Sequence, residues 1–272
     1  MNTMNEKKRY FTIYSILLGL IITIALIGPL CMSTDIYASD MGSALQAPSA
    51  EHWFGTDKLG RDVFARIIYG MQLSLGMSLA IVSLMAMLGT IVGVVAGFYG
   101  GKVESILMRI CDIMISFPGI ILAIAIAGVM GGSIGNAILA LTLVGWAKYA
   151  RIVRSLVLKV RDEDYVTAAR LSGGSSLVIM RRHILPNTLP LVFVTAGMDL
   201  GTMMLEVAGL SFLGFGAQPP TPEWGLMLNE GRQYLQMAPW LMLFPGIAIL
   251  LVVTVFNLWS DSLRDILDPK QI

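Results

Sequence analysis

Asp199 and Glu206 stand within the otherwise apolar stretch 188–212. Seven residues are about two helical turns, so both carboxylates would lie on about the same face of a helix. A carboxylate inside a membrane usually faces a cavity or a partner. The spacing indicates either a polar lining of a translocation path, which Met203 would share, or structural hydrogen bonds to neighbouring helices. Glu206 could also lie near the interface between the membrane and the outer side.

Metal chemistry has few candidate ligands in this sequence. His52 and His183 are the only histidines, and Cys31 and Cys111 lie about 80 residues apart with no ligand spacing around them. A histidine-rich metal site is therefore not expected, and the thiols do not indicate a disulfide framework. The 18 methionines offer soft ligands that suit Cu(I), but they are scattered, which favours packing. We assign no metal site from the sequence.

ATP hydrolysis also lacks its residues. The only Gly-Lys pair is Gly101-Lys102, and a phosphate-binding P-loop there would need glycine at 96 and serine or threonine at 103. The sequence has Ala96 and Val103 instead. No paired histidines and no serine–histidine constellation lie within the apolar stretches. We therefore expect a chain that is not itself catalytic.

The composition indicates what kind of chain positions these residues. Of 272 residues, 56% are hydrophobic and 14% are charged, with a mean hydropathy of +0.73. Soluble domains carry about a quarter charged residues, so we expect a membrane protein. The net charge of +1 gives no sign of nucleic acid as a partner.

Apolar stretches of about 20 residues, long enough to cross a bilayer, recur along the chain. The uncharged stretch 10–34 exceeds the apolar region of a cleaved signal peptide, about 7–15 residues, so we interpret it as a retained helix. Glycines at 131–135 divide a longer stretch by a turn. The sequence predicts an all-α polytopic membrane protein with six transmembrane helices, at about 12–32, 72–97, 106–130, 135–156, 188–212 and 240–260.

Basic residues are distributed unevenly between the two sides that these helices define. With an interior N-terminus, 15 of the 19 Lys and Arg residues fall inside, and only Lys58, Arg61, Arg66 and Arg232 fall outside. Loops rich in Lys and Arg stay in the cytoplasm, so we expect both termini there. The expected parts are 1–71 with the first helix and an outer segment, a helical core at 72–261, and a cytoplasmic tail at 262–272.

Gly89, Gly93 and Gly97 repeat at four-residue spacing on one face of the second helix. Small residues at this spacing let helix backbones approach closely in lipid. Gly197 and Gly201 repeat the pattern in the fifth helix. We interpret these glycines as helix packing within the chain, with a contact between subunits as the alternative.

The loop at 157–187 is the largest interior segment and the most charged part of the chain. Acidic residues at 162–164 suit the positive end of a helix, which we expect at 165–171. Gly173-Gly174 would end that helix in a left-handed cap.

A second short helix is expected after the glycines. Ser175 or Ser176 would cap it at 177–184, and Pro186 is expected to close it. The two helices would meet at an angle, with Ala168 and Ala169 exposed at the corner. Small residues there would let the corner enter a groove of another protein.

At this loop the sequence resembles the binding-protein-dependent ABC importer permeases. Ala168-Ala169, then Gly173, then Leu185-Pro186 have the spacing of that family's "EAA" loop, which docks as a coupling helix in a cleft of the ATPase subunit. Thr167 stands where the family usually has Glu, so any salt bridge of that position would have to come from the acids at 162–164. The resemblance implies coupling roles for Tyr165, Val166, Thr167, Ala168, Ala169, Arg170, Gly173, His183, Leu185 and Pro186.

Further stretches resemble the peptide and nickel importer permeases within that family. They are 52–62, 210–216, 219–225 and 257–269. Other stretches are more similar to nickel than to dipeptide permeases, namely 149–156, 170–173, 199–205 and 232–234. The resemblance covers nearly the whole chain and implies the type I ABC importer permease fold. It also implies that the chain is the second, shorter permease subunit of a nickel importer.

The resemblance also implies the rest of the transporter. The partners would be a second homologous permease, two cytoplasmic ATPase subunits that bind ATP and Mg, an extracellular or periplasmic solute-binding protein, and the lipid bilayer. This chain would carry no cofactor and would lie in a bacterial cell membrane as a multi-pass protein. The expected cargo is nickel or a metal chelate, with a dipeptide or oligopeptide as the alternative.

Two other classes of function have less support. A transporter driven by an ion gradient would favour broken helices in corresponding repeats, and no internal repeat is evident. An intramembrane enzyme would need a catalytic constellation within the spans, which the sequence does not supply.

Overall fold

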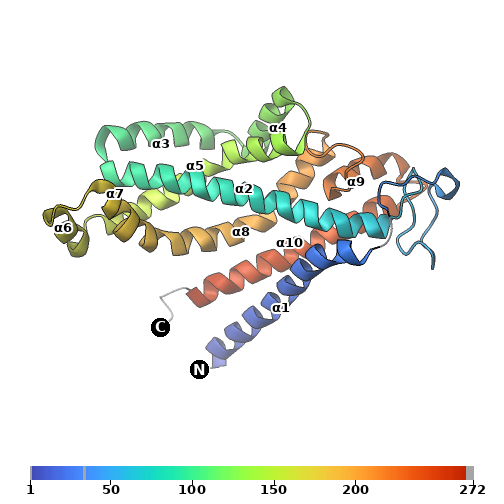
Figure 1. Cartoon of the computed structure of the whole chain (residues 1–272), viewed down its shortest axis with the longest axis horizontal. Coiled ribbons are helices and arrows are strands. Elements are labelled where there is room, and N and C mark those ends of the chain that lie inside the picture. The colour runs from blue at the N-terminus through green and yellow to red at the C-terminus, as the bar shows by residue number, and fades with distance from the viewer. Residues whose placement is uncertain (1, 33–34, 268–272) are drawn as a thin grey trace. The chain divides into compact units, whose positions relative to one another are not determined.

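The computed structural model describes residues 2–32 and 35–267, and this part of the chain is mainly helical, as predicted (Figure 1). Residues 1, 33–34 and 268–272, which include the ends of the motif at 257–269 and of the expected tail at 262–272, lie outside the described residues. The elements are α1 Asn2–Cys31, η1 Met41–Ser43, α2 Val63–Tyr99, α3 Gly101–Ser116, α4 Gly119–Met130, α5 Ile134–Val160, α6 Asp164–Leu171, α7 Ser176–Ile179, η2 Met180–Ile184, α8 Leu185–Phe212, α9 Trp224–Gly231, η3 Arg232–Tyr234 and α10 Trp240–Leu267.

The chain divides into two compact units. Unit 1 comprises Met1–Leu79, Ala127–Ile138 and Met198–Ile272, and unit 2 comprises Ala80–Ile126 and Leu139–Gly197. The long helices α2, α5 and α8 each contribute residues to both units.

Four helical segments among the described residues are long and apolar enough to cross a membrane. They are Glu6–Cys31, Val63–Tyr99, Ser176–Phe212 and Trp240–Ile266. The pair α3 and α4 passes the same test together and adds a fifth span if both halves belong to one crossing. α5 is outside this set, since Lys148, Arg151 and Arg154 lie along its second half. The structure thus gives four to five apolar spans, and a total of six depends on α5, which corresponds to the helix predicted at 135–156.

The single helix expected at 106–130 is wrong. α3 ends at Ser116, α4 begins at Gly119, and the two are bent by 91°. Pro118 lies in the break, and a proline disfavours the helical conformation of the residue before it. Phe117 is accordingly extended, with φ −95° and ψ 145°. The hydropathy pattern missed this boundary because proline interrupts a helix without adding charge.

The start of the second helix also differs from the expectation, which placed it at 72 after an outer segment ending at 71. α2 begins at Val63 because Asp62 caps it: the Ala65 backbone N–H donates to the Asp62 Oδ1 at 2.8 Å. Arg66 lies in the first turn of this helix, where its side chain is 1% exposed and lies between Asp57 and Glu230.

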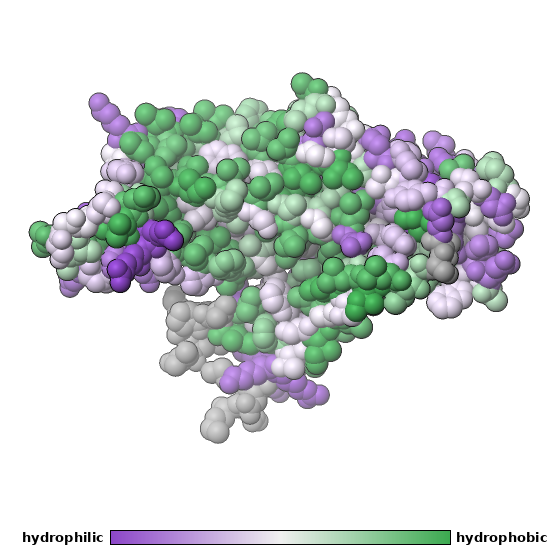
Figure 2. Space-filling model, in the orientation of Figure 1, coloured by the Kyte–Doolittle hydropathy of each residue, from purple (hydrophilic) through white to green (hydrophobic). Residues whose placement is uncertain are grey.

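Unit 1 is built around α1, α9 and α10. α1 and α10 lie side by side (Figure 1), and the Trp259 Nε1–H donates to the Ser15 Oγ at 3.1 Å. Trp224, at the start of α9, is fully buried and donates to the Ile67 carbonyl oxygen at 3.0 Å. Figure 2 shows hydrophilic side chains at the first turns of α1 and hydrophobic ones along the rest of its visible surface, as expected of a helix in lipid.

Unit 2 is held together by the packing of α2 against α5 along the three glycines. A Cβ on Gly89 would lie 2.6 Å from the Trp146 carbonyl oxygen, and one on Gly93 would lie 2.6 Å from the Ala150 carbonyl oxygen. A Cβ on Gly97 would lie 2.7 Å from the Val157 Cβ. The glycine face of α2 therefore makes a close contact within the chain.

Candidate functional site

Residues 161–187 of unit 2, here called the corner, comprise α6, α7 and the start of α8. The backbone N–H of Gly174 donates to the Ala169 carbonyl oxygen and that of Gly173 to the Arg170 carbonyl oxygen, both at 3.0 Å. This is the hydrogen-bond pattern of a Schellman cap. Gly173 has φ +80°, a left-handed conformation that glycine adopts without steric cost. The glycine pair therefore ends α6 and turns the chain toward α7.

Pro186 does not close the second helix, contrary to the expectation. Ser175 caps α7, and the helix continues through the π turn Met180–Ile184 into α8. The Leu185 backbone N–H donates to the Met180 carbonyl oxygen, five residues back. In an α-helix the proline ring would press against the carbonyl four residues earlier, and the wider π turn just before Pro186 relieves that crowding. The corner thus continues into the long apolar helix.

Two contacts hold the corner to the end of α2. The Arg161 Nη1–H donates to the Gly97 carbonyl oxygen at 2.8 Å. The Arg170 guanidinium lies over the Phe98 ring, 5.1 Å from its centroid. A cation–π contact at an exposed site contributes about 0.5–1 kcal/mol.

Further contacts hold α6 to the π turn and α8. The rings of Tyr165 and His183 lie 6.0 Å apart, and the Asn187 Nδ2–H donates to the Tyr165 hydroxyl at 3.3 Å. Val166 is the fully buried residue of α6. The corner is therefore attached to both α2 and α8.

The other expected coupling residues contribute to the surface of the corner. Ala169, His183 and Leu185 are half-buried, whereas the exposed members are Thr167, Ala168, Arg170, Gly173 and Pro186. Leu171 and Leu177 lie beside them with 86% and 72% of their surface uncovered. Large apolar side chains exposed together next to small ones are typical of a surface that binds another protein.

The acids expected to line a path lie in the part of α8 that belongs to unit 1. Asp199 and Met203 are each 7% exposed, and Glu206 is half-buried. Between them, Gly201 faces α10, where an added Cβ would lie 2.5 Å from the Asn257 Oδ1. Asp199 and Met203 are thus within the packed interior of unit 1, whereas Glu206 is only partly enclosed. The role of all three in a path stays a prediction.

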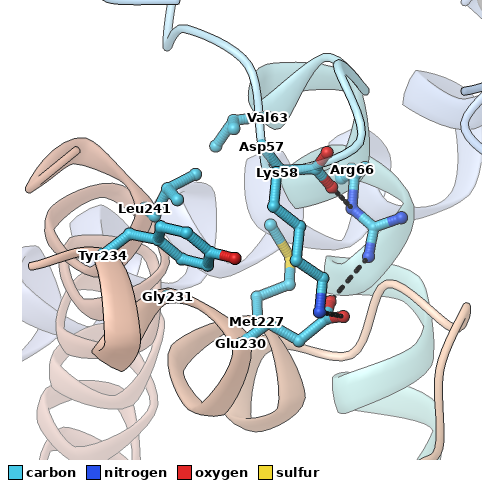
Figure 3. Close-up of a pocket in the computed structure, with 9 residues that line it drawn as sticks. All are labelled: Asp57, Lys58, Val63, Arg66, Met227, Glu230, Gly231, Tyr234 and Leu241. Carbon is cyan, nitrogen blue, oxygen red and sulfur yellow. Dashed lines mark ion pairs between the residues drawn. The ribbon is translucent and has the colours of Figure 1, made fainter. Parts of the chain in front are cut away.

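Sequence reasoning missed a cluster of charges in unit 1, here called the outer cluster, which comprises Asp57, Lys58, Arg61, Arg66 and Glu230. Its members are largely enclosed except for Lys58, whose side chain is 37% exposed. The Arg61 Nε lies 2.6 Å from the Asp57 Oδ2, and the Lys58 Nζ lies 3.2 Å from the Glu230 Oε1. Figure 3 shows Arg66 between Asp57 and Glu230, 3.6 Å from each. Glu230 comes from α9, so the cluster ties the outer segment to that helix.

The two arginines of the outer cluster are almost completely enclosed, with 2% and 1% of their side chains exposed. Their Nη2 atoms lie 3.5 and 3.6 Å from the Glu230 Oε2, an ion-pair rather than a hydrogen-bond distance. Three of the four basic residues that the sequence places on the outer side therefore pair with the same two acids, Asp57 and Glu230. The sequence did show that charged residues gather at 57–66, which was the available signal. Nothing in the sequence showed that Glu230 belongs to the same cluster.

The cavity beside the outer cluster has a volume of about 20 Å³ (Figure 3). That space holds about one water molecule, so the outer cluster acts as a structural fastening rather than a cargo site. Within the described part of the chain, no group of three or more His, Cys, Asp or Glu side chains is placed to hold a metal ion.

Glu223 is another buried acid in unit 1, and it caps α9. Its carboxylate accepts hydrogen bonds from the backbone N–H groups of Gly225 at 3.0 Å and Leu226 at 2.9 Å, and from the Ser74 hydroxyl at 3.2 Å. The side chain is fully buried, and burial raises the pKa of Glu223 above its usual range despite these hydrogen bonds.

Known proteins of similar sequence are permease proteins of transport systems. The chain is 45% identical over 265 residues to the dipeptide transport system permease protein DppC of Alkalihalophilus pseudofirmus, covering 97% of this chain and 87% of that one. It is 43% identical over 257 residues to the nickel transport system permease protein NikC of Escherichia coli K12, covering 94% and 93%. It is 46% identical over 231 residues to the glutathione transport system permease protein GsiD of Escherichia coli O6:K15:H31, covering 85% and 76%.

Solved structures show the same fold at lower identity. The MetNI methionine ABC transporter in an inward-facing conformation matches with a TM-score of 0.58 at 22% identity, covering 75% of this chain and 97% of that one. An amino acid ABC transporter with histidines matches with a TM-score of 0.55 at 16% identity, covering 74% and 94%. Residues 89–272 also match the family described as binding-protein-dependent transport system inner membrane component. The chain belongs to this family, as an ABC importer permease of the peptide, nickel and glutathione group.

Proposed function

We propose that this chain forms half of the translocation path of an ATP-driven importer and that the corner is its docking site for an ATPase subunit. The observation that carries the proposal is the combination of an exposed small and apolar surface at Ala168, Leu171 and Leu177 with rigid attachment of the corner to α2 and α8. A second homologous permease would supply the other half of the path. A solute-binding protein would deliver cargo to the outer side.

The arrangement implies how force would reach the path. Two ATPase subunits that bind ATP and Mg close on each other and displace the corners docked in them. Because Arg161 and Arg170 hold the corner to α2, and the π turn continues into α8, both helices would follow as rigid bodies. The chain itself supplies no catalytic group to this cycle, and the P-loop it lacks would be provided by the ATPase subunits.

The proposed setting is a bacterial plasma membrane crossed six times, with both termini in the cytoplasm. A total of six crossings requires α5 to be one of them. Its Arg154 pairs with Glu104 and its Arg151 pairs with Asp112, so part of the charge of α5 is neutralised within unit 2. Asp199, Met203 and Glu206 remain proposed path residues.

The proposed cargo is nickel as a chelate, or a dipeptide or oligopeptide. Sequence identity does not separate these cargoes, because the dipeptide, nickel and glutathione relatives lie between 43% and 46%. Uptake of labelled dialanine, of labelled glutathione and of radioactive nickel with excess histidine by the whole complex would separate them.

A reconstituted complex with its ATPase and binding protein tests the function. Uptake should require ATP and should fall at least tenfold with Ala168→Trp, which adds bulk to an exposed position without disturbing the core of α6. Ala168→Ser is the matched control and should transport normally. Wild-type uptake without ATP, or normal uptake by Ala168→Trp, would refute the proposal.

A further inference from the structure

One face of α2 in unit 1 borders a large open cavity. Tyr69, Gln72, Leu73, Gly76 and Met77 recur at three- and four-residue spacing, which places them on one side of the helix. They line an open cleft of about 460 Å³, here called the outer cleft, within the volume range of about 300–1,000 Å³ that is usual for small-ligand sites. Its other lining residues are Ile36, Tyr37, Ile134, Ile138, Thr221 and Pro222.

One feature distinguishes the outer cleft from a surface that faces lipid. Gln72 is exposed in it, and lipid cannot satisfy the hydrogen-bonding groups of an amide. Gly76 has no atom within 4 Å of the place where a Cβ would stand, so the wall of the cleft is open at this point. The glycines at 89, 93 and 97 differ from Gly76, because α5 fills the space that a Cβ on each of them would occupy.

The outer cleft is lined by neutral groups. Tyr69 donates its hydroxyl hydrogen to the Pro29 carbonyl oxygen at 3.0 Å, which fixes its ring, while 53% of Tyr37 is exposed. The lining residues offer an amide, two phenols, the Thr221 hydroxyl, the Met77 thioether and apolar side chains, but no carboxylate, imidazole or thiolate. Imidazole is among the ligands that suit divalent nickel, and the lining residues include none. Peptide groups and apolar side chains, in contrast, match an amide and aromatic rings.

We propose that the outer cleft is this chain's wall of the translocation path at the outer side, and that it passes an organic cargo with amide and apolar groups, such as a peptide or a metal chelate. The inference rests on the proposed function, because the orientation proposed there places residues 36–37 and 221–222 outside. A second permease that packed directly on this face would fill the space over Gly76, and the test below includes that outcome.

Cysteine accessibility in the assembled complex tests the location. In a background with Cys31→Ser and Cys111→Ala, Gly76→Cys should react with a membrane-impermeant thiosulfonate added outside, and the reaction should reduce uptake at least fivefold. Leu20→Cys is the control: Leu20 lies on α1, is 55% exposed and does not line the cleft, so it should face lipid and should not react. Failure of Gly76→Cys to react, or reaction without loss of uptake, overturns the proposal.

Obstruction of the cleft gives a second, independent readout. Gly76→Trp should lower uptake at least tenfold, while the complex still assembles and hydrolyses ATP within twofold of wild type. Gly19→Trp is the control, because Gly19 on α1 also has nothing within 4 Å of an added Cβ and lies outside the cleft. Normal uptake by Gly76→Trp overturns the assignment of the cleft.

Wild-type uptake tests the cargo class separately. Import of dialanine, glutathione or nickel with excess histidine agrees with the neutral lining, whereas import of nickel chloride without a chelator contradicts the organic cargo. ATP-independent uptake, or no uptake of any of these probes by the wild-type complex, would instead count against the proposed function, so the two failures are distinguishable.

Discussion

Gly93 determines, at the scale of one residue, how closely α2 approaches α5. Because an added Cβ would lie 2.6 Å from the Ala150 carbonyl oxygen, Gly93→Leu must push the two helices apart. Overpacking of this kind costs about 1–3 kcal/mol, so we expect a lower thermal midpoint of the purified complex. Gly19→Leu, where space is free, should leave the midpoint unchanged. Equal midpoints for both variants would mean that unit 2 is not held by this contact.

Glu223 predicts a pH dependence of stability. Its folded-state pKa is raised above the ordinary value of 4.5 by burial, so its contribution to stability is fully present below 4.5 and is lost as the pH rises through the folded pKa. Glu223→Gln removes this titration while keeping the shape. The stability of Glu223→Gln relative to wild type should therefore increase from pH 4 upward and then level off.

Thermal unfolding of both proteins across that pH range measures the effect. Asp40 gives a comparison of opposite sign, because hydrogen bonds from the Ser43 hydroxyl and the Gly42 N–H lower its pKa. Its contribution is present at higher pH and is lost as the pH falls through the lowered pKa. A difference between wild type and Glu223→Gln that is constant with pH would contradict the burial argument.

The attachment of the corner to α2 is a property of whole elements. Phe98→Leu removes the ring beneath Arg170 and changes no residue of α6. We expect the ATPase subunits to bind normally and hydrolyse ATP, with fewer cargo molecules imported per ATP. Tyr99→Leu is the control, since Tyr99 is 56% exposed on the same turn. A loss of ATPase binding by Phe98→Leu would place its effect at the docking surface instead.

The outer cluster is the corresponding fastening of unit 1. Glu230→Gln leaves Lys58, Arg61 and Arg66 with Asp57 as the single acid of the cluster. Breaking a buried ion pair costs about 3–5 kcal/mol, so the segment at 35–62 should become sensitive to limited proteolysis. Glu51→Gln, at an exposed position of the same segment, should keep wild-type resistance.

The sequence predicted those elements that local signals define. The Gly173 cap, the helix at 165–171 and the turn at 131–133 follow from residues within a few positions of each other, and the structure has each of them. The break at Pro118 was also local, but a charge count does not detect it. The outer cluster and the outer cleft join residues more than 140 positions apart, and no spacing rule reaches that far.

At the scale of the whole molecule, α5 decides on which side the corner lies. Its 27 residues extend about 40 Å, more than the roughly 30 Å of a bilayer's hydrocarbon core. The helix is therefore long enough to cross with its last turns outside the hydrocarbon. Those turns carry Arg154, whose Nε donates to the Glu104 Oε1 at 2.6 Å, and Lys159. Crossing by α5 would place the turn at 131–133 and the corner on opposite sides.

Thiol labelling of intact cells tests this topology. In the background without native cysteines, Glu51→Cys and Ser133→Cys should react with an impermeant reagent, whereas Ser172→Cys should react only after the membrane is permeabilised. If α5 does not cross, Ser133→Cys and Ser172→Cys will label from the same side. An ATPase in the cytoplasm could not reach a corner that labels from outside. The same three variants therefore decide whether α5 crosses the membrane and whether the corner lies on the side where an ATPase subunit could bind it.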